Sequence, residues 1–70
     1  MAGQRILVVD DDSQIVKVCT KALRASGFVV ESSLDGREAI ALLREKKFDL
    51  LIVNLMMPDI DGFEILRIAR

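Results

Sequence analysis

The sequence predicts an α/β fold, a doubly wound layer structure around a parallel sheet. Short apolar runs rich in β-branched residues alternate along the 70-residue chain with segments whose apolar residues recur at helical spacing. The order is β-α-β-α-β, followed by the start of a third helix. Strands that alternate with helices pair in parallel through right-handed crossovers, and the helices cover the faces of the sheet.

The first predicted strand and helix occupy residues 5–9 and 13–26. The strand, RILVV, is continuously apolar after its first residue, which is typical of a central strand buried on both faces. Asp12 or Ser13 can cap the amino end of the helix, and Gly27 stands where a C′ glycine belongs. The expected apolar face of the helix, including the single cysteine as a small core residue, consists of Ile15, Val16, Cys19, Ala22 and Leu23.

An outer strand and a second helix are expected next. Residues 28–32 have strand propensity but become polar quickly, as expected of an outer strand. Asp35 and Glu38 have the spacing of a capping box, so a helix begins there. It ends at Lys46 and Lys47, whose charges suit the carboxyl end of a helix dipole. Its apolar face consists of Ala39, Ile40, Leu42 and Leu43.

A third strand is predicted over residues 49–54, and a helix begins in residues 62–70, which allow about two turns. The strand is apolar from residue 50 to residue 53, and the sequence supplies it with a neighbour on one side only. Such an edge pairs readily with another strand. We therefore expect either a missing remainder of the domain or a homodimer joined through this third-strand edge.

Composition and charge limit the classes of partner. Ten Lys and Arg against eleven Asp and Glu give a net charge of −1, and no run of basic residues favours nucleic acid. No apolar run approaches the roughly 18 residues that a membrane-spanning helix needs. A single cysteine without a second thiol fits a reducing compartment. We expect a cytoplasmic chain that itself binds neither nucleic acid nor membrane.

Polar residues follow two of the predicted strands where each strand ends. Asp10, Asp11 and Asp12 follow the first strand, and Asn54 ends the third. If these strands are neighbours, their carboxyl ends meet at one edge of the sheet, where ligands bind in such folds. Clustered carboxylate and carbonyl oxygens suit Mg²⁺. Asp12 can equally be a helix cap and nothing more, whereas one cap does not account for the two further carboxylates.

Two motifs resemble the receiver domain of two-component response regulators. ILVVDDD at residues 6–12 is similar to that family's first strand and acidic pair, and LLIVNLMMPDIDGFEIL at residues 50–66 resembles its phosphorylation loop. The resemblance implies a flavodoxin-like fold with strand order 2-1-3 in this chain, and a phosphorelay signalling module rather than an enzyme. It also implies a histidine kinase or another signalling protein as partner. Residues 1–70 would be the amino-terminal portion of one receiver-like domain, without its fourth and fifth strands.

The resemblance also implies roles for individual residues. Asp10 and Asp11 would be the acidic pair of a magnesium site, with Asp11 the better candidate for a direct ligand. The backbone carbonyl of Met56 would be a further ligand. Pro58 and Gly62 would shape the loop and the start of the third helix, consistent with the fixed φ of proline and the freedom of glycine.

Asn54 occupies the position at which the family carries its phosphoacceptor aspartate. An amide has no anionic oxygen to attack phosphorus, so the chain would be unable to accept a phosphoryl group as written. Loss of one negative charge also predicts that Mg²⁺ binding is weakened or absent. The chain is then a natural pseudo-receiver or an engineered variant, and the sequence leaves both open.

Two alternatives to a signalling module follow from the same residues. The chain could be a Mg²⁺-dependent, phosphohydrolase-like α/β enzyme that uses Asp10 or Asp11 as nucleophile. The MMPDIDG loop has no role in such an enzyme, and the first-strand motif lacks its D-x-D spacing. The other alternative is a self-associating fragment without a function of its own.

Overall fold

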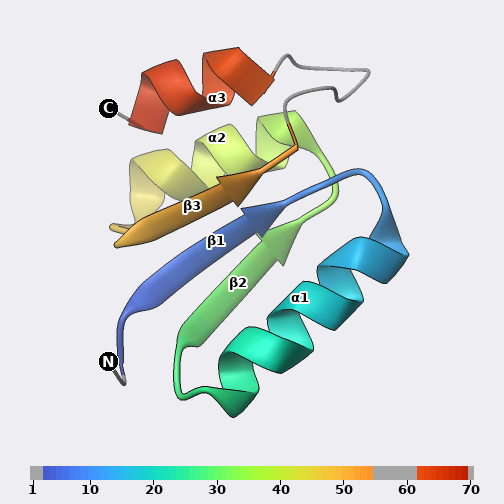
Figure 1. Cartoon of the computed structure of the whole chain (residues 1–70). Helices are drawn as coiled ribbons and strands as arrows, with labels where there is room; N and C mark the ends of the chain where they lie inside the picture. Colours follow the sequence, from blue (N-terminus) through green and yellow to red (C-terminus); the bar gives the residue numbers. More distant parts are fainter. Residues whose placement is uncertain (1–2, 55–61, 70) are drawn as a thin grey trace.

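Strands and helices alternate along the chain in the predicted order (Figure 1). The computed structural model describes residues 3–54 and 62–69. None of the helices in these ranges is long and apolar enough to cross a membrane. The elements are β1 (Arg5–Val9), α1 (Ser13–Ala25), β2 (Val29–Ser33), α2 (Gly36–Glu45), β3 (Leu50–Val53) and α3 (Gly62–Ala69).

The three strands form a parallel sheet in the order β2-β1-β3, which confirms the predicted fold class and strand order. Ile6 of β1 lies beside Val30 of β2 on one side and Leu50 of β3 on the other. The central strand is buried along almost its whole length, because every side chain from Ile6 to Val9 is at most 2% exposed. The continuous apolar run of β1 therefore fills both layers of the core.

Helices α2 and α3 cover one face of the sheet (Figure 1). The buried residues on this face are Leu7 and Val9 of β1, Ala39 of α2 and Ile65 of α3. Each side chain is at most 1% exposed. Half-buried side chains of α2, β3 and the segment between them complete this core: Ile40, Leu42, Leu43, Phe48, Leu51 and Val53.

Helix α1 covers the other face over β1 and β2, where Ile6, Val8, Val16 and Val30 form the core (Figure 1). Cys19 is half-buried against this cluster with Leu23 and Phe28, so its prediction as a core residue is confirmed.

The expected apolar face of α1 is partly wrong. Ile15 is 47% exposed and Ala22 is also exposed, whereas Thr20 is buried. Burial of the Thr20 hydroxyl costs little because it donates to the carbonyl of Lys17 at 3.1 Å. The buried stripe of α1 therefore runs through Val16 and Thr20, on the side of the helix that packs over β1 and β2.

The caps of α1 agree with the sequence. The Asp12 carboxylate accepts from the backbone N–H of Gln14 at 2.9 Å and of Ile15 at 3.4 Å, so Asp12 rather than Ser13 is the N-cap. Gly27 follows the helix with φ of 95°, a left-handed conformation that glycine adopts without steric cost.

Only half of the predicted capping box of α2 forms. The Asp35 carboxylate accepts from the Arg37 N–H at 2.9 Å. The Asp35 N–H donates to the hydroxyl of Ser33 at 3.1 Å, which takes the place expected for Glu38. The helix ends at Glu45, and Lys46 is its C-cap residue.

Candidate functional site

Hydrogen bonds of the sheet position the polar residues at its carboxyl edge. The backbone N–H of Asp10 donates to the Ser33 carbonyl at 3.2 Å, which ties the end of β1 to the end of β2. The N–H of Asn54 donates to the Val9 carbonyl at 2.9 Å, which ties the end of β3 to β1. Asp10 directly follows β1, and Asn54 is hydrogen-bonded to the last residue of β1. The central strand therefore fixes the backbone positions of both residues.

The structure brings together the three side chains that the strand order places at this edge. The Nδ2 atom of Asn54 donates to Oδ1 of Asp10 at 3.2 Å and lies 3.4 Å from Oδ1 of Asp11. Both carboxylates thus approach the same amide nitrogen from residues more than 40 positions away in sequence. Because ionised carboxylates only accept hydrogen bonds, the amide presents its NH₂ group to them.

Asp10 is the most constrained carboxylate of this cluster. It is half-buried, and its Oδ1 accepts from the backbone N–H of Asp12 at 3.0 Å as well as from the Asn54 amide. These donors hold the pKa of the Asp10 carboxyl below its ordinary value, chiefly the Asp12 N–H, against the opposing effect of partial burial. Asp10 is therefore ionised at neutral pH.

Asp12 directly follows this pair in the sequence, but its side chain caps helix α1. Its carboxylate accepts the two N–H groups at the start of α1, as its interpretation as a cap requires. The three consecutive aspartates are therefore divided between a helix cap and a pair of carboxylates that meet Asn54.

The carboxylate pair is compensated by the amide alone among the described side chains. The described ion pairs join Lys46 to Glu31 and Arg67 to Glu64, and neither of them includes Asp10 or Asp11. Within residues 3–54 and 62–69, no group of three or more His, Cys, Asp or Glu side chains is placed to hold a metal ion. A divalent cation at this edge could be bound by the two carboxylates. The carbonyl oxygen of Asn54 could become a ligand only if the side-chain amide flipped.

Ser33 supports the site and was not singled out from the sequence. Its side chain is 2% exposed, donates to the Asp35 carbonyl at 2.7 Å and accepts from the Asp35 N–H. Its own carbonyl receives the Asp10 N–H. Ser33 therefore links the turn before α2 to the backbone of the acidic pair. The one available signal was a serine two residues before a helix-capping aspartate.

The remaining predicted site residues follow β3 in the sequence. Met56 and Pro58 lie outside the described residues. Gly62 is the first residue of α3, at the boundary that the sequence predicts. The roles of these three residues stay predictions.

The fold and this edge define a class of protein. Residues 6–70 match the family described as the response regulator receiver domain. The chain therefore belongs to this family, whose domains are signalling modules of two-component systems rather than classical enzymes. Its parallel sheet of order 2-1-3 is the flavodoxin-like arrangement of the receiver fold.

Two full-length regulators show the sequence relationship. The chain is 40% identical over 68 residues to the regulatory protein VanRc of Enterococcus gallinarum, covering 97% of this chain and 29% of VanRc. It is 40% identical over 67 residues to the DNA-binding response regulator MtrA of Mycobacterium tuberculosis, covering 96% and 29% of the two chains. The chain thus spans less than a third of the curated relatives that it matches.

Solved receiver structures superpose on the same residues. The chemotaxis protein CheY4 of Vibrio cholerae matches with a TM-score of 0.92 and 36% identity, over 99% of this chain and 57% of CheY4. The response regulator TrrA of Thermotoga maritima, solved in complex with Mg²⁺-BeF, matches with a TM-score of 0.83 and 34% identity, over 89% and 54%. TrrA was also solved in complex with the histidine kinase ThkA, with a TM-score of 0.83 and 33% identity, over 91% and 55%.

Proposed function

We propose that the chain is a receiver module of a two-component phosphorelay that cannot be phosphorylated, because Asn54 stands at the acceptor position. The observation that carries the proposal is the place of Asn54 at the carboxyl end of β3, with its amide nitrogen against Asp10 and Asp11. In a competent receiver a carboxylate at this point attacks phosphorus. The amide nitrogen is held by two acceptors, and the amide oxygen carries no negative charge.

Magnesium binding is weakened in this proposal but its ligands remain. Asp10 and Asp11 supply hard oxygen ligands of the kind that Mg²⁺ prefers, and the similar protein TrrA was solved in complex with Mg²⁺-BeF. The Met56 carbonyl, with Pro58 and Gly62 shaping its loop, completes the proposed site by resemblance. When bound, the ion would neutralise charge on phosphoryl oxygens. In this chain the Asn54 NH₂ group occupies the acceptors that the ion would use, so the ion must displace it.

The proposed partner is a histidine kinase or another signalling protein of the cytoplasm. The ThkA–TrrA complex supports this because TrrA resembles the chain over most of its length. A pseudo-receiver would act through contacts that do not depend on phosphorylation. A second copy of the chain is the other partner expected from the sequence. That contact would use the edge of β3 and not the candidate site. We propose further that residues 1–70 form the amino-terminal portion of a five-stranded receiver domain.

Incubation with a small-molecule phosphodonor and Mg²⁺, followed by intact-mass measurement, tests the proposed function. The chain is expected to show no phosphoryl adduct and no turnover of the donor. The Asn54→Ala variant is the control, since it also lacks a nucleophile but removes the amide from the acidic pair. A stable adduct on the unmodified chain would contradict the proposal, and turnover that depends on Asp10 or Asp11 would favour the hydrolase.

A further inference from the structure

The side-chain amide of Asn54 has two ends of opposite polarity, an NH₂ group that donates hydrogen bonds and a carbonyl oxygen that accepts them. The NH₂ end faces the acidic pair, since Nδ2 lies 3.2 Å from Oδ1 of Asp10 and 3.4 Å from Oδ1 of Asp11. An ionised aspartate at this position would present two equivalent oxygens. An asparagine can therefore face the pair in two different ways, whereas an aspartate can face it in only one.

The charge near the acidic pair decides which end of the amide faces it. Two ionised carboxylates attract the NH₂ group, and hydrogen bonds to ionised groups are stronger than those between neutral groups. They repel the carbonyl oxygen, which carries a partial negative charge. Asp10 does not depend on the amide alone, because its Oδ1 also accepts from the Asp12 N–H at 3.0 Å. The Asp10 carboxylate therefore keeps a donor when the amide flips.

A divalent cation bound to the two carboxylates would reverse this preference. A cation repels the NH₂ group and attracts the carbonyl oxygen, and Mg²⁺ takes hard oxygen ligands. Rotation about the Cβ–Cγ bond exchanges the two ends of the amide, which fills nearly the same volume in both orientations. The backbone of Asn54 need not move, because its N–H stays bonded to the Val9 carbonyl at 2.9 Å. The flip is therefore confined to one side-chain bond.

We propose that the Asn54 amide flips when a divalent cation binds. Its NH₂ group faces Asp10 and Asp11 without the ion, and its carbonyl oxygen faces the bound ion. This inference rests on the proposed function and adds a signal to it, since the site would respond to a divalent cation in place of a phosphoryl group. Asn54 is only half-buried, so the flip also changes which of its hydrogen-bonding groups a partner protein can contact.

NMR of the isotopically labelled chain tests the flip directly. Asn54 is the only asparagine, so its side-chain signals are separate from those of the exposed Gln4 and Gln14, which are internal controls. Without divalent metal, the Asn54 NH₂ protons should exchange with water about tenfold more slowly than those of the two glutamines. MgCl₂ should remove this protection and shift the Asn54 Cγ signal. NaCl at equal ionic strength should do neither.

Two results of this titration would overturn the proposal. One is protection of the Asn54 NH₂ group that persists while the backbone signals of Asp10 and Asp11 respond to MgCl₂, because the ion would then bind without the flip. The other is no response of any of these signals to MgCl₂. Neither result bears on whether residue 54 accepts a phosphoryl group, which the phosphodonor experiment measures separately.

Two variants that each remove one negative charge separate the site from the net charge of the chain. Asp11→Asn removes an expected ligand and should raise the MgCl₂ midpoint of the Asn54 response about tenfold or more. Asp49→Asn is the matched control at the other end of β3, where the carboxylate accepts from the Arg5 N–H at 2.8 Å and an amide oxygen can do the same. It should leave the midpoint unchanged, and equal shifts in the two variants would overturn the proposal.

Discussion

The sheet face under α2 and α3 and the carboxyl edge of the same sheet meet between Val9 and Asp10. Val9 is 1% exposed and surrounded by apolar side chains. Asp10, one residue on, is partly solvent-exposed and accepts hydrogen bonds from Asp12 and Asn54. Apolar packing stabilises the sheet face, whereas hydrogen bonds from N–H groups to ionised carboxylates stabilise the carboxyl edge. The polar contacts of the edge are therefore separate from the packing of the face, so a substitution at residue 54 is expected to leave the face intact.

Truncating a face residue is expected to have the largest effect. Leu7 is fully buried in the core under α2 and α3, so Leu7→Ala should lower the free energy of unfolding by about 2–5 kcal/mol. Leu34→Ala removes the same atoms from a side chain that is 49% exposed and should cost about 0.5 kcal/mol. Urea denaturation followed by circular dichroism measures both. Similar losses of unfolding free energy in the two variants would mean that apolar packing does not stabilise this face.

Placing a carboxylate at residue 54 should have a smaller effect on stability, and this effect should depend on metal. Asn54→Asp removes the NH₂ group that Asp10 and Asp11 share and adds a third negative charge. Without divalent metal it should destabilise the chain by about 1 kcal/mol, the scale of charge interactions at a solvated site. Thermal melts with and without Mg²⁺ measure this.

Saturating Mg²⁺ should reverse the loss in Asn54→Asp and leave the loss in Leu7→Ala unchanged. If the Asn54→Asp variant is equally or more stable than the unmodified chain without metal, the amide does not compensate the acidic pair.

Acidification should have the smallest effect on stability, and this effect should come from the carboxyl edge of the sheet. The pKa of Asp10 is held below its ordinary value of 3.8, so its ionised form is favoured by folding. This contribution to stability is complete above pH 3.8 and is lost as the pH falls through the lower pKa of the folded state. Asp10→Asn should therefore lose less stability on acidification in that range. An NMR titration of the Asp10 carboxyl at or above 3.8 would contradict the assigned hydrogen bonds.

Most of the fold could be predicted because its signal is local. The apolar run of β1, the caps at Asp12 and Gly27, and the alternation of element types are all visible in short windows of sequence. The buried stripe of α1 was predicted less well. Ile15 has the right spacing for the core yet is exposed, whereas Thr20 is buried because a hydrogen bond to its own helix satisfies it. Where a helix lies over a sheet depends on distant residues.

The candidate site could also be predicted only in part. That Asp10, Asp11 and Asn54 lie together follows from parallel strands and their order, which the sequence pattern and the family resemblance supplied. The direction of the Asn54 amide did not follow, because it depends on which acceptors surround it in the folded chain. The support from Ser33 was equally hidden, since it consists of contacts to two other segments.

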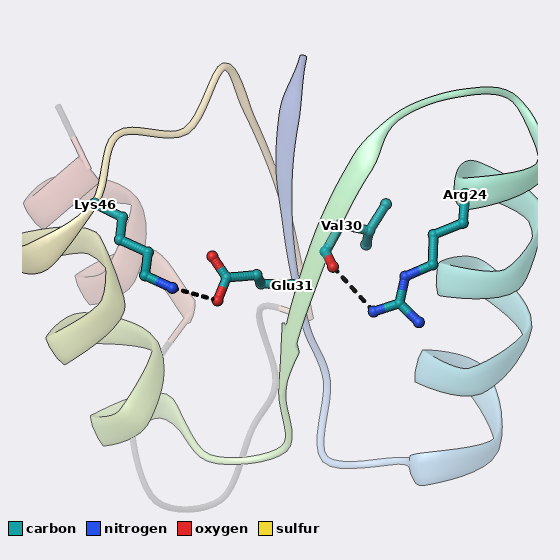
Figure 2. A network of polar contacts seen from close by, with 4 residues as sticks. All are labelled: Arg24, Val30, Glu31 and Lys46. Atoms are coloured by element: carbon teal, nitrogen blue, oxygen red, sulfur yellow. Dashed lines mark hydrogen bonds and ion pairs between the residues drawn. The ribbon is translucent and has the colours of Figure 1, made fainter. Parts of the chain in front are cut away.

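The guanidinium of Arg24 donates to the Val30 carbonyl of β2 at 3.0 Å, and this contact has a consequence for aggregation (Figure 2). The Val29 N–H points to β1, and backbone groups of successive strand residues alternate between the two sides, so those of Val30 point outward from the sheet. Unpaired outward backbone groups are a template on which strands of other molecules can add. Because Arg24 occupies this carbonyl from within the chain, a foreign strand could pair along β2 only by displacing a charged side chain.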